Sequence, residues 1–282
     1  MSLRADVGFL TLSILFLGCS AELGSPEPVA SDAETIVRGT IDDEHPAVML
    51  IDVLTFDGGE TFCSATLYAE RTLVTAAHCL ENAAIVFAYF GNDFFGDFEQ
   101  LFEDPATWTN FRLSESWEVH PKWDPATLNA DIAVVHLDRD VPFRPIPLAK
   151  RNIGRPFEGE RMTIVGYGAT GFDEMGFPVD ALVKRRGKAV YRGSPSAKPL
   201  PPDPHPGLGD KKIRDQLMEL DGSPPHSNAC AGDSGGPVLV TIKGEEQIAG
   251  VASWGDAQCN DYAYYVRVHD FHPFLKKAAK HK

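Results

Sequence analysis

Short runs in which apolar and polar residues alternate occupy most of the chain, with the two-residue period of strands that bury one face. Clusters of glycine, proline and polar residues separate these runs. Eleven of them predict strands: 47–55, 62–68, 72–75, 84–90, 111–120, 132–137, 161–167, 184–191, 237–242, 247–254 and 262–268. Only 270–280 has helical spacing, with Asp270 placed as its N-cap. The pattern predicts an all-β chain, either an antiparallel barrel or a sandwich.

Two longer stretches carry no strand pattern and are expected to be surface loops. The first, 91–109, is acidic and aromatic, and its carboxylates lack the regular spacing of a calcium loop, so we expect no bound metal. The second, 193–227, contains the run PLPPDPHPGLG, whose prolines lack the N–H that a strand ladder needs.

The N-terminus carries an export signal. Residues 7–17 (VGFLTLSILFL) are an apolar run of 11 residues, too short for a membrane-spanning helix and typical of a signal-peptide core. The sequence FLGC that ends at Cys19 resembles a bacterial lipobox and predicts a lipid anchor on Cys19. Cleavage by a conventional signal peptidase after the small-residue stretch 19–21 is the alternative. Under either interpretation the protein is exported, as an anchored precursor or in secreted form.

Charge narrows the choice of partners. The 282 residues include 40 acidic and 26 basic side chains, a formal net charge of −14. Such an excess disfavours nucleic acid and anionic membrane surfaces as main partners. The sequence contains no heptads or internal repeats, and we expect a monomer that uses no cofactor.

The cysteine count agrees with export. Besides Cys19 there are four others, Cys63, Cys79, Cys230 and Cys259. An even number in an exported chain suggests two disulfides, for which three pairings are possible. There is no C-x-x-C pair, which argues against a zinc site.

The candidate chemistry centres on Ser234, in the segment NACAGDSGGPVLV. A serine is a weak nucleophile unless a neighbouring base, itself oriented by a third group, activates it. Two other segments offer such groups. His78 follows two small alanines at the end of TLVTAAHC, and Asp131 stands at the mouth of the apolar run DIAVV. A carboxylate in that setting is poorly solvated and needs a partner.

The motifs TAAHC, DIAVV and GDSGGP, in this order, resemble those of trypsin/chymotrypsin-type serine endopeptidases. The similarity runs from about residue 36 to the C-terminus and includes IVRGT, GYG and SWG. It implies two packed antiparallel six-stranded β-barrels with a C-terminal helix, the first barrel over about 36–150 and the second over about 151–282. Residues 1–35 are then the signal and a pro-segment. Because only two disulfides are available, the chain looks like a bacterial member.

The resemblance implies a role for each motif residue. His78 acts as general base and then as general acid, Asp131 orients its ring, and Ser234 attacks the substrate carbonyl to form an acyl-enzyme. The backbone N–H groups of Gly232 and Ser234 form the oxyanion hole. The expected partners are protein or peptide substrates.

The family also implies activation by cleavage before Ile36, whose new ammonium pairs with the buried carboxylate of Asp233. Thr35 precedes the cleavage point instead of arginine or lysine, so the activating protease is unknown. Arg38 stands where the family usually has glycine.

The remaining expectations concern the substrate. Ser253, Trp254 and Gly255 would pair with the substrate backbone as an added strand. Asn228 stands at the pocket floor in place of the aspartate of trypsins, and the small residues Gly255 and Ala263 would be its walls, which favours an uncharged P1 side chain. The family's disulfides would be Cys63–Cys79 and Cys230–Cys259.

The motifs argue against two rival classes of protein. A secreted binding protein on the same fold, without catalysis, would usually lack one of the three catalytic residues. An α/β-hydrolase esterase would need its histidine last in chain order, whereas His78 comes first here.

Overall fold

The structure is a computed structural model that describes residues 36–101, 109–197 and 206–280. The predicted signal, Cys19 and the pro-segment lie outside these ranges. Within them, no helix is both long and apolar enough to cross a membrane.

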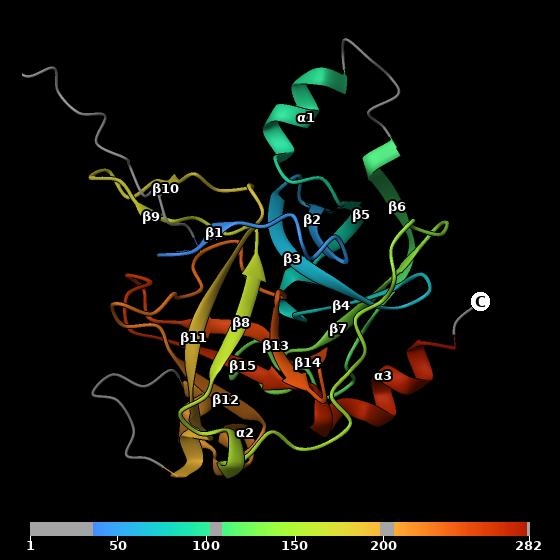
Figure 1. Ribbon diagram of the computed structural model, residues 1–282. Coiled ribbons are helices and arrows are strands. Elements are labelled where there is room, and N and C mark those ends of the chain that lie inside the picture. Colours follow the sequence, from blue (N-terminus) through green and yellow to red (C-terminus); the bar gives the residue numbers. More distant parts are fainter. Residues whose placement is uncertain (1–35, 102–108, 198–205, 281–282) are drawn as a thin grey trace, which may run out of the picture. The chain divides into compact units, whose positions relative to one another are not determined.

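The first half of the chain forms a closed antiparallel barrel of six strands (Figure 1). The strands are β2 (Val48–Thr55), β3 (Glu60–Ala69), β4 (Thr72–Thr75), β5 (Ala83–Tyr89), β6 (Phe111–Val119) and β7 (Ala133–Leu137). They follow the order β2-β3-β4-β7-β6-β5, and β5 closes the ring by pairing with β2. Closure leaves no strand edge unpaired, which protects these apolar strands from aggregation.

The second half forms a second ring of six antiparallel strands. These are β8 (Arg161–Gly166), β11 (Arg185–Gly193), β12 (Leu217–Asp221), β13 (Pro237–Ile242), β14 (Glu245–Gly255) and β15 (Tyr262–Arg267). The ring closes because β8 pairs with both β11 and β13. Three short strands lie outside it: β1 (Thr40–Ile41), which pairs with β11, and the hairpin β9 (Gly171–Phe172) with β10 (Pro178–Val179).

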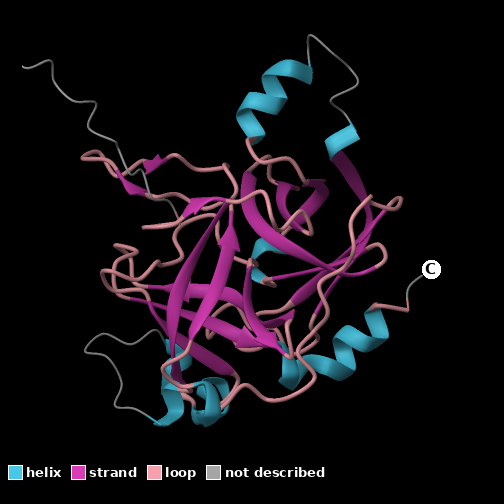
Figure 2. Cartoon of the chain, viewed as in Figure 1, coloured by secondary structure: helices cyan, strands magenta, loops and turns pink. Residues whose placement is uncertain are grey.

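Among the described residues three α-helices accompany the barrels: α1 (Phe94–Leu101), α2 (Lys211–Arg214) and α3 (His272–Ala278). Figure 2 shows them in cyan together with short 3-10 turns. Helix α3 packs on the first barrel. The Tyr68 hydroxyl of β3 donates to the Leu275 carbonyl at 2.9 Å, and the His120 ring meets the rings of Phe271 and Phe274 edge-on. The end of the chain thereby ties the two halves together.

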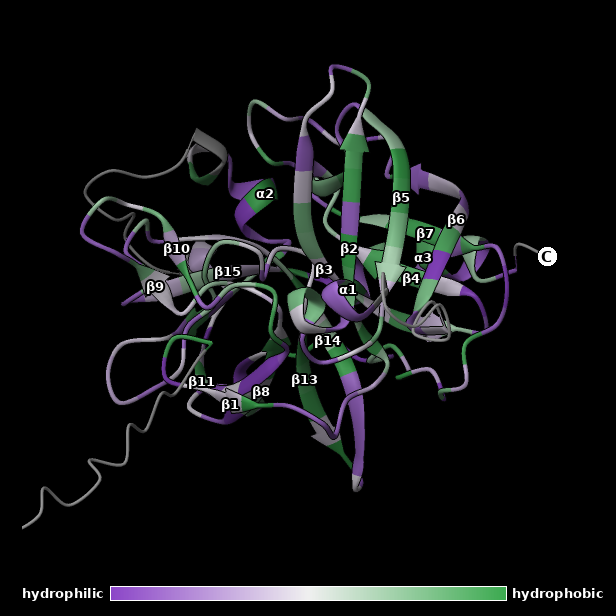
Figure 3. Cartoon of the chain, turned by 90° about the horizontal axis from the view of Figure 1, so that it is seen from above, coloured by the Kyte–Doolittle hydropathy of each residue, from purple (hydrophilic) through white to green (hydrophobic). Residues whose placement is uncertain are grey.

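Alternation along the strands places the cores inside the barrels. Figure 3 shows β5 almost uniformly hydrophobic, and β2 (VMLIDVLT) is hydrophobic apart from one internal aspartate and its last residue. The larger cluster of buried apolar residues fills the first barrel, with residues such as Leu50 and Val134, and continues into the second half through Leu239 and Val251. A smaller cluster, which includes Ile164 and Val238, lies in the second barrel. Burial of this apolar surface is the main favourable contribution to folding.

The prediction of two six-stranded barrels with a C-terminal helix is confirmed, and three details were wrong. Strand β12 lies within the predicted loop 193–227, and helix α1 lies within the predicted loop 91–109. Asp270 is not the N-cap of the last helix, because a 3-10 turn over Val268–Phe271 precedes α3. The Asp270 carboxylate instead pairs with Arg267 at 3.1 Å.

Candidate active site

His78 is held by Asp131 at the open end of the first barrel. Strand β4 ends at Thr75, and a 3-10 turn over His78–Leu80 directs the imidazole away from the strand. Asp131 lies two residues before β7, which pairs with β4. Its Oδ2 lies 2.8 Å from His78 Nδ1, and its Oδ1 accepts the His78 backbone N–H at 2.9 Å. A carboxylate can only accept, so Nδ1 carries the proton and Nε2 is left as the base.

The second barrel contributes a third donor to the same carboxylate. Ser253 Oγ, on β14, donates to Asp131 Oδ2 at 2.5 Å. Asp131 is fully buried, and these three hydrogen bonds compensate its loss of hydration. The sequence motif SWG points to Ser253, but gives no sign of a bond between its hydroxyl and Asp131.

Ser234 is brought toward His78 by two short connections. The Ser64 backbone N–H donates to the Ser234 carbonyl at 2.7 Å, and the preceding Cys63 is bonded to Cys79, the neighbour of His78. Gly235 packs against Thr75 and Ser64, so tightly that a Cβ there would overlap the Thr75 hydroxyl and the Ser64 carbonyl. The serine turn therefore lies directly against the strand end that carries the histidine.

The ring of His78 remains partly open to solvent, with 26% of its side chain exposed. Burial disfavours the imidazolium, but the hydrogen bond and charge of Asp131 outweigh that and raise the pKa of His78 above its usual value. Within the described ranges no hydrogen bond joins Nε2 to Ser234 Oγ. Such contacts are often long before substrate binds.

Gly232 adopts a backbone that favours glycine. Its φ is +96°, and its carbonyl accepts a hydrogen bond from Ser64 Oγ at 3.0 Å. The Gly232 carbonyl is turned toward Ser64. In the described part of the chain, the backbone N–H groups of Gly232 and Ser234 donate no hydrogen bond. The turn can present both N–H groups to a bound oxygen.

Ser234 lines a cavity of about 280 Å³, called the Ser234 cavity below. Its lining is mostly small or apolar and includes four residues expected from the sequence: Ser253, Trp254, Gly255 and Ala263. The disulfide Cys230–Cys259 forms part of the wall. The arrangement can hold one side chain next to a serine hydroxyl.

Asn228 is buried but does not line the Ser234 cavity, whereas Asp256 does line it. The Asn228 amide donates to Asp256 Oδ2 at 3.2 Å. The backbone N–H groups of residues 258 and 260–262 also donate to this carboxylate. Burial opposes ionisation of Asp256, but these N–H donors outweigh it and hold its pKa below the usual value. The sequence does not reveal this role of Asp256, because it depends on the turn that follows β14.

Asp233 is buried and turned inward. Its carboxylate accepts the backbone N–H groups of Gly168 and Cys230, each at 2.8 Å. Burial raises the pKa of Asp233 to about 6, while those two bonds and the charge of Arg185 limit the rise. Arg185 pairs with Gly166 across the β8–β11 ladder, and Gly166 lies against the Asp233 carboxylate. Paired residues share a face of the sheet. The positively charged side chain of Arg185 therefore lies on the same face of the sheet as the Asp233 carboxylate.

Ile36 and Arg38 enter from the N-terminal segment. Ile36 is buried beside Gly187 and Ser227. Arg38 has a φ of 63°, in the left-handed region that favours glycine. Its guanidinium donates to the carbonyls of His226 and Gly222 and to Asn260 at 3.1 Å, which offsets that strain.

One group of metal-type side chains occurs in the described ranges, formed by Cys63, His78 and Cys79. The two sulfurs are joined to each other in a disulfide. They are therefore not thiolate ligands, and the group does not fit a metal ion.

The two closed barrels, with an aspartate–histidine pair beside a serine-lined cavity, define the class of two-barrel serine hydrolases. A family model described as Trypsin matches residues 39–275. The chain belongs to this family and is a serine endopeptidase; the alternative of an inactive binding protein is not favoured.

Relatives from distant organisms agree with that assignment. The chain is 28% identical over 237 residues to a trypsin of Saccharopolyspora erythraea, a match that covers 82% of this chain and 92% of the relative. It is 26% identical over 241 residues to trypsin epsilon of Drosophila erecta, with 79% of each chain covered. A solved structure of HL collagenase shares the fold, with a TM-score of 0.66 and 21% identity over 87% of this chain and 99% of that one. The predicted bacterial origin remains a prediction.

Proposed function

We propose that the endopeptidase works through His78, Asp131 and Ser234, with an acyl-enzyme on Ser234. The observation that carries this proposal is the double hydrogen bond from His78 to Asp131, next to the turn that holds Ser234. It leaves Nε2 as the base that takes the Ser234 proton when Oγ attacks the carbonyl. The imidazolium then returns that proton to the leaving amine.

The charge that develops on the carbonyl oxygen is received by the N–H groups of Gly232 and Ser234. Support comes from the positive φ of Gly232 and from its carbonyl, which is bound to Ser64 on the far side. Preorganised donors of this kind typically lower the barrier by several kcal/mol, about 3 for a single donor. The backbone of Ser253–Gly255 would align the substrate as an added strand.

The Ser234 cavity is proposed to take an uncharged P1 side chain. Alanine, glycine and cysteine dominate its wall, and its one carboxylate, Asp256, is already surrounded by N–H donors. A P1 arginine would have to share that carboxylate with Asn228 and four backbone groups. Cleavage rates on a peptide library that varies only P1 test this: leading rates for arginine or lysine would contradict it.

Activation is proposed to follow cleavage before Ile36, by a protease that the sequence does not identify. The buried carboxylate of Asp233 keeps a raised pKa in spite of the charge of Arg185, which supports the need for a further cation; the new N-terminus would supply it. Residues 1–35 would then be the export signal and pro-segment of an exported, monomeric enzyme, and 36–282 its catalytic part. If Cys19 carries lipid, the same cut releases the enzyme from the membrane.

Activity measurements on the chain that begins at Ile36 test the catalytic assignment. His78→Ala and Ser234→Ala should each lower kcat on a peptide amide by about 10⁶. Ser227→Ala is the matched control, because Ser227 is buried but makes no bond to the three catalytic residues. Equal activity in Ser234→Ala and wild type would refute the assignment.

A further inference from the structure

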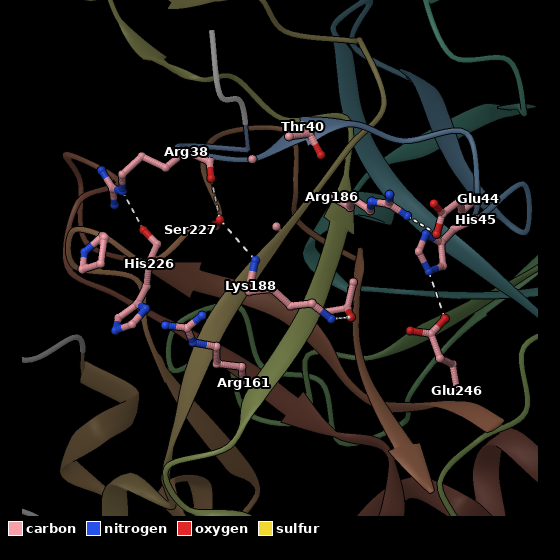
Figure 4. A pocket seen from close by; sticks show the side chains of 14 residues that line it. Arg38, Thr40, Glu44, His45, Arg161, Arg186, Lys188, His226, Ser227 and Glu246 are labelled. Carbon is pink, nitrogen blue, oxygen red and sulfur yellow. Dashed lines mark hydrogen bonds and ion pairs between the residues drawn. The ribbon is translucent and has the colours of Figure 1, made fainter. Parts of the chain in front are cut away.

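A second and larger cavity, of about 670 Å³, lies on the outer face of β8 and β11 and is called the basic pocket below (Figure 4). The N-terminal segment, the loop before β2 and the turn before Asn228 complete its wall. It shares no lining residue with the Ser234 cavity. The proposed catalytic function makes no use of it.

At one end of the basic pocket the charges are paired. Arg186 forms an ion pair with Glu44, and His45 lies 2.8 Å from Asp42 and 3.0 Å from Glu246. Burial disfavours the charged ring, but the hydrogen bonds and charges of Asp42 and Glu246 raise the pKa of His45. Both carboxylates that line the pocket therefore already have a cationic partner.

At the other end stand Arg161, Lys188 and His226 (Figure 4). Lys188 Nζ donates to Thr163 Oγ1 at 2.5 Å and so retains two further N–H donors. Arg161 is exposed, and in the described ranges neither it nor Lys188 has an acidic side chain within ion-pair distance. Glu160 lines an adjoining cavity together with Arg161 and Lys188, but it forms no ion pair with either of them.

The strand register places these two cations on the same face. Lys188 is paired with Thr163 across the β8–β11 ladder, and Arg161 lies two residues before Thr163. Residues at such diagonal positions are about 7–8 Å apart at their Cα atoms, so the two positive charges repel each other. A doubly charged anion bound between the two cations would attract each of them and so offset their mutual repulsion. The planar guanidinium and the ammonium suit a tetrahedral oxyanion.

We propose that Arg161, Lys188 and His226 form a binding site for a phosphate or sulfate group, free or as the monoester of a small molecule. A small ligand is favoured over a polymer, because the net charge of −14 repels an extended polyanion at long range. Thr163, bound to Lys188, would hold the ammonium in place for the ligand.

Calorimetric titration of the full chain tests the proposal, with Ser234→Ala included to prevent self-digestion. The probes are inorganic phosphate and glycerol 2-phosphate, at constant ionic strength and with potassium chloride as the blank. We expect saturable binding of one equivalent of at least one probe. Which probe binds more tightly distinguishes a free ion from an ester. Arg161→Gln/Lys188→Gln should weaken binding by at least about tenfold, since two charge-assisted contacts are lost.

The matched control is Arg144→Gln/Lys150→Gln, which removes the same charges from exposed positions outside the pocket. It should bind as wild type does. A second measurement needs no variant: phosphate should slow acetylation of Lys188, followed by mass spectrometry, and leave that of Lys150 unchanged. The proposal fails if neither probe saturates, if the Arg161/Lys188 variant binds as wild type does, or if phosphate protects both lysines equally.

Discussion

Asp131 accepts two hydrogen bonds from the same residue, His78, one at each carboxylate oxygen. The backbone N–H reaches Oδ1 at 2.9 Å and the ring Nδ1 reaches Oδ2 at 2.8 Å. The two contacts fix both the position of the turn and the tautomer of the ring. The proposed general base is therefore held in one position and one tautomer.

Replacing Asp131 by asparagine should both slow the reaction and move its pH dependence. Neutral His78 is the active form, so kcat/KM rises as pH rises through the pKa of His78. Without the carboxylate, burial is opposed only by the charge of Glu81, the smallest of these contributions, and the pKa of His78 falls, so the rise shifts to lower pH. At pH 8, kcat should fall by roughly 10⁴. A pH profile that keeps its wild-type midpoint would contradict the assigned role of Asp131.

Replacing Ser253 by alanine should shift the pH profile of kcat/KM in the opposite direction, to higher pH. Ser253→Ala removes a donor from Asp131, which becomes a stronger acceptor for the imidazolium and raises the pKa of His78 further. The rise of kcat/KM should shift to higher pH, with kcat reduced by about tenfold. Ser227→Ala, as the matched control, should leave the midpoint in place. A lower kcat without a shift would show that Ser253 acts only through packing.

Asn228→Asp should not convert the enzyme to cleavage after arginine. The new carboxylate would lie beside Asp256, which already accepts the Asn228 amide, and two like charges at such close range repel each other. We expect lower activity on all substrates, and partial recovery with a gain for P1 arginine only when Asp256→Asn is added. Rates on matched leucine and arginine substrates decide between the outcomes. A single Asn228→Asp variant that prefers arginine would contradict the arrangement described.

Asp233 should give the precursor a distinctive pH dependence of stability. Burial raises its pKa from 3.8 to about 6, so between these values the folded chain binds more protons than the unfolded one. This group therefore destabilises the fold as pH rises from about 4 to about 6, by about 3 kcal/mol in all. Asp233→Asn lacks this contribution. Urea denaturation of both precursors, each carrying Ser234→Ala, should show the difference in unfolding free energy grow over that range; parallel profiles would refute it.

Most of the fold could be predicted from alternation, because a barrel strand with one buried face carries its pattern in its own residues. Strand β12 could not. It has five residues, follows a proline-rich stretch, and owes its place to long-range pairing with β11 and β15. Helix α1 was missed for a related reason: its acidic and aromatic residues suggested a solvated loop, yet Phe94 is buried against Tyr89 and Phe111.

The features of the candidate site also fall into those that the sequence predicts and those that only the fold reveals. Three motifs point to His78, Asp131 and Ser234, because their chemistry requires specific residue types in a specific setting. The bonds from Ser253 to Asp131 and from Ser64 to the serine turn join distant segments, so no local pattern announces them. Asp256 is similar, since its donors come from a turn whose geometry only the folded chain defines.

The most direct test of the central claim is covalent labelling of Ser234. An organophosphonate that phosphonylates activated serines, with loss of the leaving group on phosphorus, should modify the chain that begins at Ile36 at one position, and peptide mapping by mass spectrometry should find the adduct on Ser234. Ser234→Ala should remain unlabelled, and Asp131→Asn should label far more slowly. Labelling at another serine, or an active enzyme that takes up no label, would contradict the account.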